Sequence, residues 1–219
     1  SGAAMTFPFP IMAPATGATI TYTDSAAIVA TGTVFTHTAR ALGTPAADRI
    51  ILVGTYGSRS SAGARSVSGI TANGTALALV KDWGGASANT MEVWGAVVAA
   101  GATGDVVVTF TGGDMVSCGI MVAEIHGANT TVYATAADAV NDPPSVGVNV
   151  TAGGVVFAYA VNANGAGADA FTWTNATERF DAVIQTNLIY HSGATDAYAS
   201  AQTPITVTAN PDLAMVEGG

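Results

Sequence analysis

Hydrophobic and polar residues along this chain alternate with the two-residue period of β-strands. In "ATITYTD", Ile20 and Tyr22 fall on one face and threonines on the other. "RIILVGTYG" is apolar along its whole length, which is typical of a strand covered on both faces. No window combines an apolar stripe at helical spacing with capping residues. The pattern therefore predicts an almost purely β protein.

The order of strands and turns predicts how these strands associate. Roughly a dozen or more strands follow one another at about 8–12-residue spacing, separated by turn residues. The pair Asn73-Gly74 lies between two β-like segments, which predicts a tight hairpin. We predict an antiparallel β-sandwich or a jelly roll.

Four short blocks recur in the same order, which indicates an internal duplication. "MVAEIHGA" in the first half resembles "LAMVEGG" at the end of the chain. The pseudo-repeats cover about 48–128 and 154–217. The other three blocks align Ile50 with Val155, Ile70 with Phe171, and Thr109 with Thr206.

The duplication permits either two small sandwiches or one shared core. Aromatic residues make up only 7% of the 219 residues, and a small isolated β-domain usually needs more of them. A joint core buries the many Val and Ala faces at lower cost. We therefore predict a single domain over 17–219. It follows a cloning remnant, "SGAAM", and an extended Pro-rich arm, which together form 1–16.

Charge and hydropathy exclude two classes of partner. The formal net charge is −9, with only six basic residues, so the chain can neutralise few phosphates and nucleic-acid binding is not expected. No apolar run reaches the ~18 residues that cross a bilayer, so we expect no membrane insertion. After Met5 no basic segment precedes an apolar one, so no signal peptide is predicted.

Residues with catalytic chemistry do not form a recognisable motif. Cys118 lies in an apolar run and is expected to be a buried, inert thiol. Glu124 and His126 share one strand face, and we interpret them as a strand-end pair, with a functional pair as the alternative. Neither a nucleophile elbow nor metal-ligand spacing is present. We expect no enzymatic activity, no cofactor and no metal.

Ligand-binding candidates are arginines and aromatic residues. The loop "GTYGSRSSAGARS" over 54–66 contains Arg59 and Arg65, whose guanidinium groups suit carboxylates and sulfates. Trp83 follows Lys81 and Asp82 in a turn-like segment and is expected to be exposed, so that its ring could stack on a sugar. We interpret Trp94 as a core residue. Tyr56 and Trp173 complete the set of candidates.

One resemblance adds a function to this fold. The series "RIILVGTYG", "ITANGTALALV", "MEVWGAVVAAGATGDVVVTFTG" and "MVAEIHGA", over about 48–128, resembles a β-rich module of bacteriophage virion surface proteins. It is also similar to head-spike and fibre proteins of alphaproteobacterial phages and gene transfer agents. A fainter copy covers 154–217. In that family "MVAEIHGA" would be a structural strand.

The resemblance implies a virion-exposed attachment protein that binds capsular polysaccharide on the host cell. It would contact other virion proteins through one end, such as the N-terminal arm, and it could form oligomers. It would be extracellular after release of the particle. Two alternatives stay open. One is a purely structural virion or decoration domain, and the other is a glycan-active enzyme with two carboxylates facing each other across a cleft.

Overall fold

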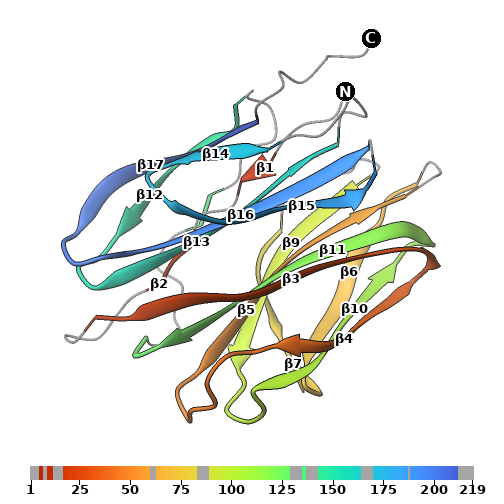
Figure 1. Ribbon diagram of the computed structural model, residues 1–219, viewed down its shortest axis with the longest axis horizontal. Helices are drawn as coiled ribbons and strands as arrows, with labels where there is room; N and C mark the ends of the chain where they lie inside the picture. The colour runs from red at the N-terminus through yellow and green to blue at the C-terminus, as the bar shows by residue number, and fades with distance from the viewer. Residues whose placement is uncertain are drawn as a thin grey trace. The chain divides into compact units, whose positions relative to one another are not determined.

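The chain folds into antiparallel β-sheets, which confirms the all-β prediction. A computed structural model describes residues 5–6, 9–11, 17–59, 63–82, 89–128, 135–136, 143–163, 170–186 and 188–211. Within these residues every regular element is a strand, and none is a helix able to span a membrane. The chain divides into two compact units (Figure 1), which we call the first unit, Thr21–His126, and the second unit, Ser1–Ile20 with Gly127–Gly219.

The first unit is built on two antiparallel sheets. One has the strand order β3-β11-β5-β9-β8 and the other has the order β4-β10-β6-β7. Side chains from both sheets, such as Val53 and Phe35, meet in one hydrophobic core, so the sheets pack as a sandwich. The strands are β3 (Thr19–Gly32), β4 (Val34–Ala41), β5 (Ile50–Ser58), β6 (Ser66–Ala72), β7 (Thr75–Ala76), β8 (Ala78–Asp82), β9 (Asn89–Val97), β10 (Thr103–Thr111) and β11 (Met115–His126).

Burial along individual strands follows the sequence pattern. All nine residues of β5 are buried, as predicted for a continuously apolar strand. In β10, by contrast, Val106, Val108 and Phe110 are buried while the residues between them are more exposed. This is the alternation of a strand with one covered face.

The predicted hairpin at Asn73-Gly74 is present between β6 and β7. Ala72 pairs with Thr75, and the two turn residues have φ values of 48° and 77°. Two successive positive φ angles define the turn that matches the twist of a two-residue hairpin. Asparagine and glycine adopt such angles at the lowest steric cost.

The second unit also contains two antiparallel sheets. One has the order β1-β13-β16-β15, with β2 also paired to β13, and the other has the order β12-β17-β14. Val156 and Val207 belong to one core that includes residues of both sheets. The strands are β1 (Met5–Thr6), β2 (Phe9–Ile11), β12 (Ser145–Val150), β13 (Gly154–Asn162), β14 (Phe171–Thr174), β15 (Thr177–Gln185), β16 (Ile189–Tyr198) and β17 (Gln202–Pro211).

The two units have matching strand orders. The order β5-β9-β8 in the first unit corresponds to β13-β16-β15 in the second, and β4-β10-β6 corresponds to β12-β17-β14. These correspondences also keep the order of the strands along the chain. They agree with three of the four sequence blocks, which aligned β5 with β13, β6 with β14 and β10 with β17. An internal duplication explains this agreement most simply. The fourth block pairs "MVAEIHGA" with "LAMVEGG" at 213–219, which lies outside the described residues.

Buried residues alternate along both β10 and β17. They include Val106, Val108 and Phe110 in β10, and Val207 and Ala209 in β17. Several offsets superimpose these buried positions, because short Val/Thr strands match one another equally well at several registers. One of these offsets aligns Thr109 with Thr206, and this alignment remains a prediction.

The N-terminal strands occupy a position that a different strand fills in the first unit. There β11 pairs with β5, whereas β1 and β2 pair with the corresponding strand β13. The Pro-rich segment thus includes two short edge strands. The single domain over 17–219 remains a prediction. So does the jelly-roll topology.

Candidate functional site

The predicted ligand-binding residues lie in different environments. Trp83 lies outside the described residues. Tyr56 is fully buried in β5, so no face of its ring is available for stacking, and its prediction as a ligand-binding residue is corrected. Trp173 is partly buried against the core of the second unit, and its indole N–H donates to Ser192 Oγ at 2.8 Å. Arg59 and Arg65 stand at the end of β5 and just before β6.

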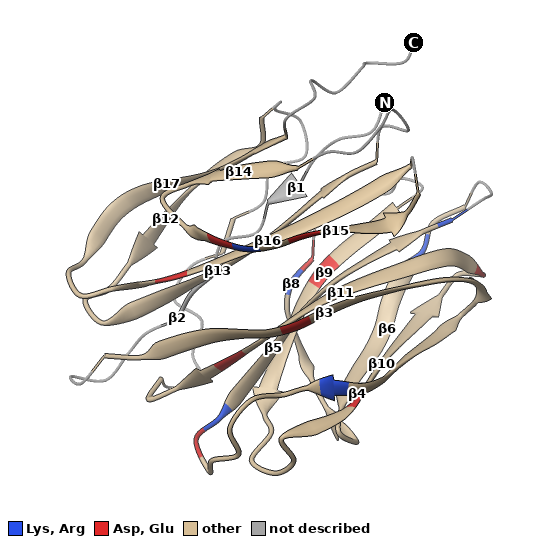
Figure 2. Cartoon of the chain, in the orientation of Figure 1, with Lys and Arg blue, Asp and Glu red and all other residues tan. Residues whose placement is uncertain are grey.

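Charged side chains are sparse in both units. Figure 2 shows Lys, Arg, Asp and Glu as small separate segments on strands that are otherwise uncharged. Among the described residues, Arg40 forms an ion pair with Asp24, and the ring nitrogens of His126 lie within 4 Å of carboxylate oxygens of Asp48 and Glu124.

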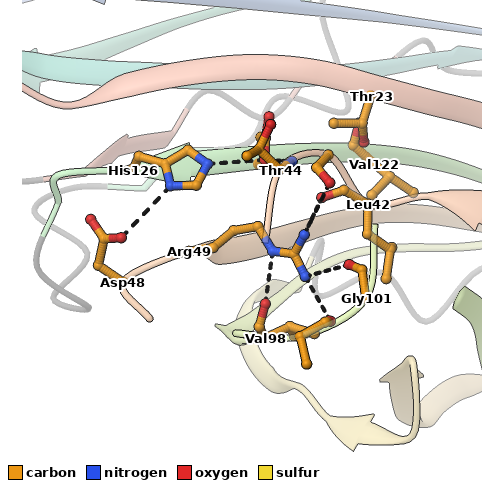
Figure 3. A network of polar contacts seen from close by, with 12 residues as sticks. Thr23, Leu42, Thr44, Asp48, Arg49, Val98, Gly101, Val122 and His126 are labelled. Carbon is orange, nitrogen blue, oxygen red and sulfur yellow. Dashed lines mark hydrogen bonds and ion pairs between the residues drawn. The ribbon is translucent and has the colours of Figure 1, made fainter. Parts of the chain in front are cut away.

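Glu124 and His126 form a strand-end pair, as the sequence indicated. His126 Nε2 lies 3.0 Å from Glu124 Oε2, and His126 Nδ1 lies 3.7 Å from Asp48 (Figure 3). Glu124 is buried and also accepts the backbone N–H of Thr44 at 2.7 Å. A Cβ at Gly43 would lie 2.1 Å from this carboxyl group. The carboxylate therefore anchors the loop that precedes β5.

Arg49 completes this polar network from the other side of the loop. Its side chain is fully buried. A guanidinium group has five N–H donors, and Arg49 directs them to the carbonyls of Leu42, Gly43, Val98, Ala100 and Gly101 (Figure 3). No donor is left for a substrate. Arg49 thus ties the β4–β5 loop to the β9–β10 loop, and its role is structural.

Cys118 is an inert core residue, as predicted. It is completely buried, and its sulfur lies 3.6 Å from Thr55 Oγ1. Burial raises the pKa of the thiol to about 12. The thiolate, which is the reactive form, is therefore not populated near neutral pH.

A shallow hollow of about 390 Å³ opens on the first unit beside Trp94. Its lining residues include apolar residues and three that carry hydroxyl groups, Ser68, Thr71 and Thr109, and Ser68 Oγ donates to the Thr109 carbonyl at 3.1 Å. A Cβ added at Gly69, which also lines the hollow, would meet no atom within 4 Å, so the space above this glycine is open. The remaining lining residues are Ile70, Ala76, Leu77, Trp94 and Val107.

Glu92 holds the indole of Trp94 in a fixed orientation. Its carboxylate accepts the indole N–H at 2.8 Å, the backbone N–H of Val67 at 2.9 Å and the hydroxyl of Thr90 at 3.2 Å. Burial raises the pKa of Glu92, while these three hydrogen bonds act in the opposite direction. Because Val67 belongs to β6, this carboxylate also joins β9 to the strand that lines the hollow.

Sequence reasoning had assigned Trp94 to the core alone. The structure shows that the ring packs against the core of the first unit and also lines the hollow. One signal was available in the sequence. Glu92 and Trp94 lie two residues apart in an apolar strand, so their side chains share a face, and a buried carboxylate needs a donor such as an indole N–H.

The described residues include no cluster of three or more His, Cys, Asp or Glu side chains that could hold a metal ion. Comparisons with models of known protein families, with curated proteins and with solved structures found no match. The candidate site therefore rests on geometry alone. It consists of the hollow beside Trp94 together with the arginines that precede β6.

Proposed function

We propose that this protein is a non-catalytic attachment protein that binds polysaccharide on a host cell from the surface of a phage-like particle. The hollow beside Trp94 supports this proposal best. The particle itself is proposed from the resemblance of residues 48–128 to virion surface modules.

The chemistry of the hollow suits a sugar ring. A pyranose has an apolar face of C–H groups and a rim of hydroxyls, so it matches an aromatic ring beside hydroxyl donors and acceptors. Trp94 supplies the ring, and Ser68, Thr71 and Thr109 supply the hydroxyls. The volume of about 390 Å³ lies within the usual range for small-ligand sites. Because Glu92 already orients the indole, little side-chain freedom is lost on binding.

A shallow single site binds one ring weakly, and a particle surface compensates for this. Many copies displayed together convert weak binding of each ring into strong attachment to a repeating polymer. A polysaccharide with repeating sugar units can therefore be held by many copies of the protein on one particle. An isolated copy in solution is expected to bind with low affinity.

Filling the hollow tests this proposal. In Gly69→Val the new side chain enters open space, so it blocks the hollow without removing a core contact. We expect binding to immobilised capsular polysaccharide, measured by biolayer interferometry with the protein multivalently displayed, to fall at least tenfold. Gly32→Val is the matched control, because a Cβ at Gly32 also meets no atom within 4 Å but does not line the hollow.

The structural alternative predicts a different result in the same experiment. A decoration domain that only stabilises a particle would give equal signals for the wild type, Gly69→Val and Gly32→Val. The N-terminal strands favour this second role. Met5–Thr6 and Phe9–Ile11 add to the edge of β13, and short terminal strands at a sheet edge are elements that neighbouring copies can exchange.

A further inference from the structure

We propose that Arg59 and Arg65 form a binding site for one anionic group, a carboxylate or a sulfate, on the first unit. The inference rests on the proposed function for one point only, namely that the anion is carried by a polysaccharide. The ligand would then be an acidic capsule polymer rather than a neutral one.

The two guanidinium groups converge on one point of the chain. A Cβ built on Gly63 would lie 2.8 Å from Arg65 Nη1 and 3.9 Å from Arg59 Nη1. The two positive groups are thus neighbours, although they come from opposite ends of the loop between β5 and β6. Like charges at such short range repel each other, and an anion between them would turn this repulsion into attraction.

Neither arginine forms an ion pair among the described residues. Arg59 Nε and Nη1 are buried and have no hydrogen-bond partner in the part of the chain that the structure describes. Arg65 donates to two backbone carbonyls, that of Asp114 at 3.5 Å and that of Ala64 at 3.3 Å. A buried donor without a partner is energetically costly. A ligand oxygen would remove this cost once a local opening exposes the Arg59 nitrogens.

Glycines allow Arg65 to lie close to the backbone. A Cβ at Gly113 would be 2.6 Å from Arg65 Nη2, so a side chain there would displace the guanidinium group. Gly113 and Gly63 also have φ values of 132° and 130°, which L side chains rarely adopt. Arg65 thus lies against the backbone at Gly113, and its planar guanidinium group carries the pair of parallel N–H donors that bind a carboxylate or sulfate.

The anion site lies close in sequence to the hollow. Arg65 immediately precedes β6, and Gly69 of β6 lines the hollow. Four residues of strand span about 13 Å. One polymer chain could therefore place a sugar ring beside Trp94 and the acidic group of another residue against the arginines. The site would also give local attraction to an acidic polymer in a chain whose net charge is −9.

Calorimetric titration with sodium sulfate, at constant ionic strength set with sodium chloride, tests the site directly. We expect saturable binding by the wild type, with the dissociation constant raised at least tenfold in Arg59→Gln and in Arg65→Gln. Arg40→Gln is the matched control. It removes the same charge from the first unit, but from a residue paired with Asp24. Equal dissociation constants in all four proteins, or no saturable binding by the wild type, would overturn the proposal.

Folding and the proposed function are checked separately. Far-ultraviolet circular dichroism and the unfolding midpoint establish that each variant is folded. A further variant, Arg59→Lys, keeps the positive charge and is expected to retain part of the sulfate binding. Polygalacturonate binding that is lost in Arg59→Gln and retained in Gly69→Val would support the anion site even if the hollow binds no sugar. Equal polygalacturonate binding by the wild type, Arg59→Gln and Arg65→Gln would contradict it.

Discussion

Arg49 is the residue on which the loops of the first unit most depend. Its five N–H donors all bond to backbone carbonyls. Arg49→Met should lower the free energy of unfolding by about 3 kcal/mol or more, because a buried group left unsatisfied costs about 1–3 kcal/mol. Arg49→Lys, with three donors, should lose less. Urea denaturation followed by tryptophan fluorescence measures both, and equal stability of Arg49→Met and wild type would contradict this role.

His37 predicts how stability changes with pH. Its ring is buried, and neither ring nitrogen has a hydrogen-bond partner within the described part of the chain. Burial, helped by Arg40 and opposed by Asp24, lowers its pKa from 6.5 to about 4. The unfolded chain therefore takes up a proton that the folded chain does not, and stability falls as the pH falls from about 6.5 to 4. Between pH 7 and pH 5 the expected loss is about 2 kcal/mol.

The matched variant for this prediction is His37→Val, because valine is apolar, favours strands and does not titrate. Urea denaturation at pH 7, 6 and 5 should show a smaller loss for His37→Val than for the wild type. The difference between the two slopes isolates the histidine from the carboxylates, which both proteins share. Parallel slopes would show that His37 does not titrate as its burial implies.

At the residue scale, the sequence predicted what depends on local surroundings and missed what depends on packing. The burial of Cys118 and the pairing of Glu124 with His126 follow from their strand. The burial of Tyr56 follows from its strand as well, because a continuously apolar strand is covered on both faces, and proposing this residue as a ligand-binding residue conflicted with that pattern. The hollow was missed because Trp94 and Thr109 come from strands of two different sheets.

Elements were predicted more completely than residues, because period and turn chemistry are local. The Asn73-Gly74 turn is the clearest case. Gly74 has a φ of 77°, which costs a residue with a side chain about 1–2 kcal/mol. Gly74→Ala should therefore lower the unfolding free energy by about that amount, as measured by thermal or urea unfolding. A Cβ at Gly74 meets no atom within 4 Å, so the cost would come from the backbone alone.

Gly32→Ala provides the control for the turn prediction. A Cβ at Gly32 also meets no atom within 4 Å, and no positive φ occurs at this residue. Its substitution should change stability by only a few tenths of a kcal/mol. If the two alanine variants were equally stable, the turn geometry would not be the source of the cost.

At the scale of the whole molecule, three of the four sequence blocks link strands that hold matching positions in the two units. The orders β5-β9-β8 and β13-β16-β15 agree with these blocks, and the internal duplication remains a prediction. The units nevertheless differ in their chemistry. The arginine pair and the hollow beside Trp94 both belong to the first unit. The proposed ligand-binding site therefore lies in only one of the two similar units. We expect the first unit to account for ligand binding.

The most direct test of the attachment role is a pull-down of purified protein by encapsulated bacteria and by the same bacteria stripped of capsule. The wild type and Gly32→Val should sediment with encapsulated cells and stay in solution with stripped cells, while Gly69→Val should stay in solution with both. Equal sedimentation of the folded wild type with encapsulated and stripped cells, or none with either, would contradict polysaccharide attachment and favour the structural role.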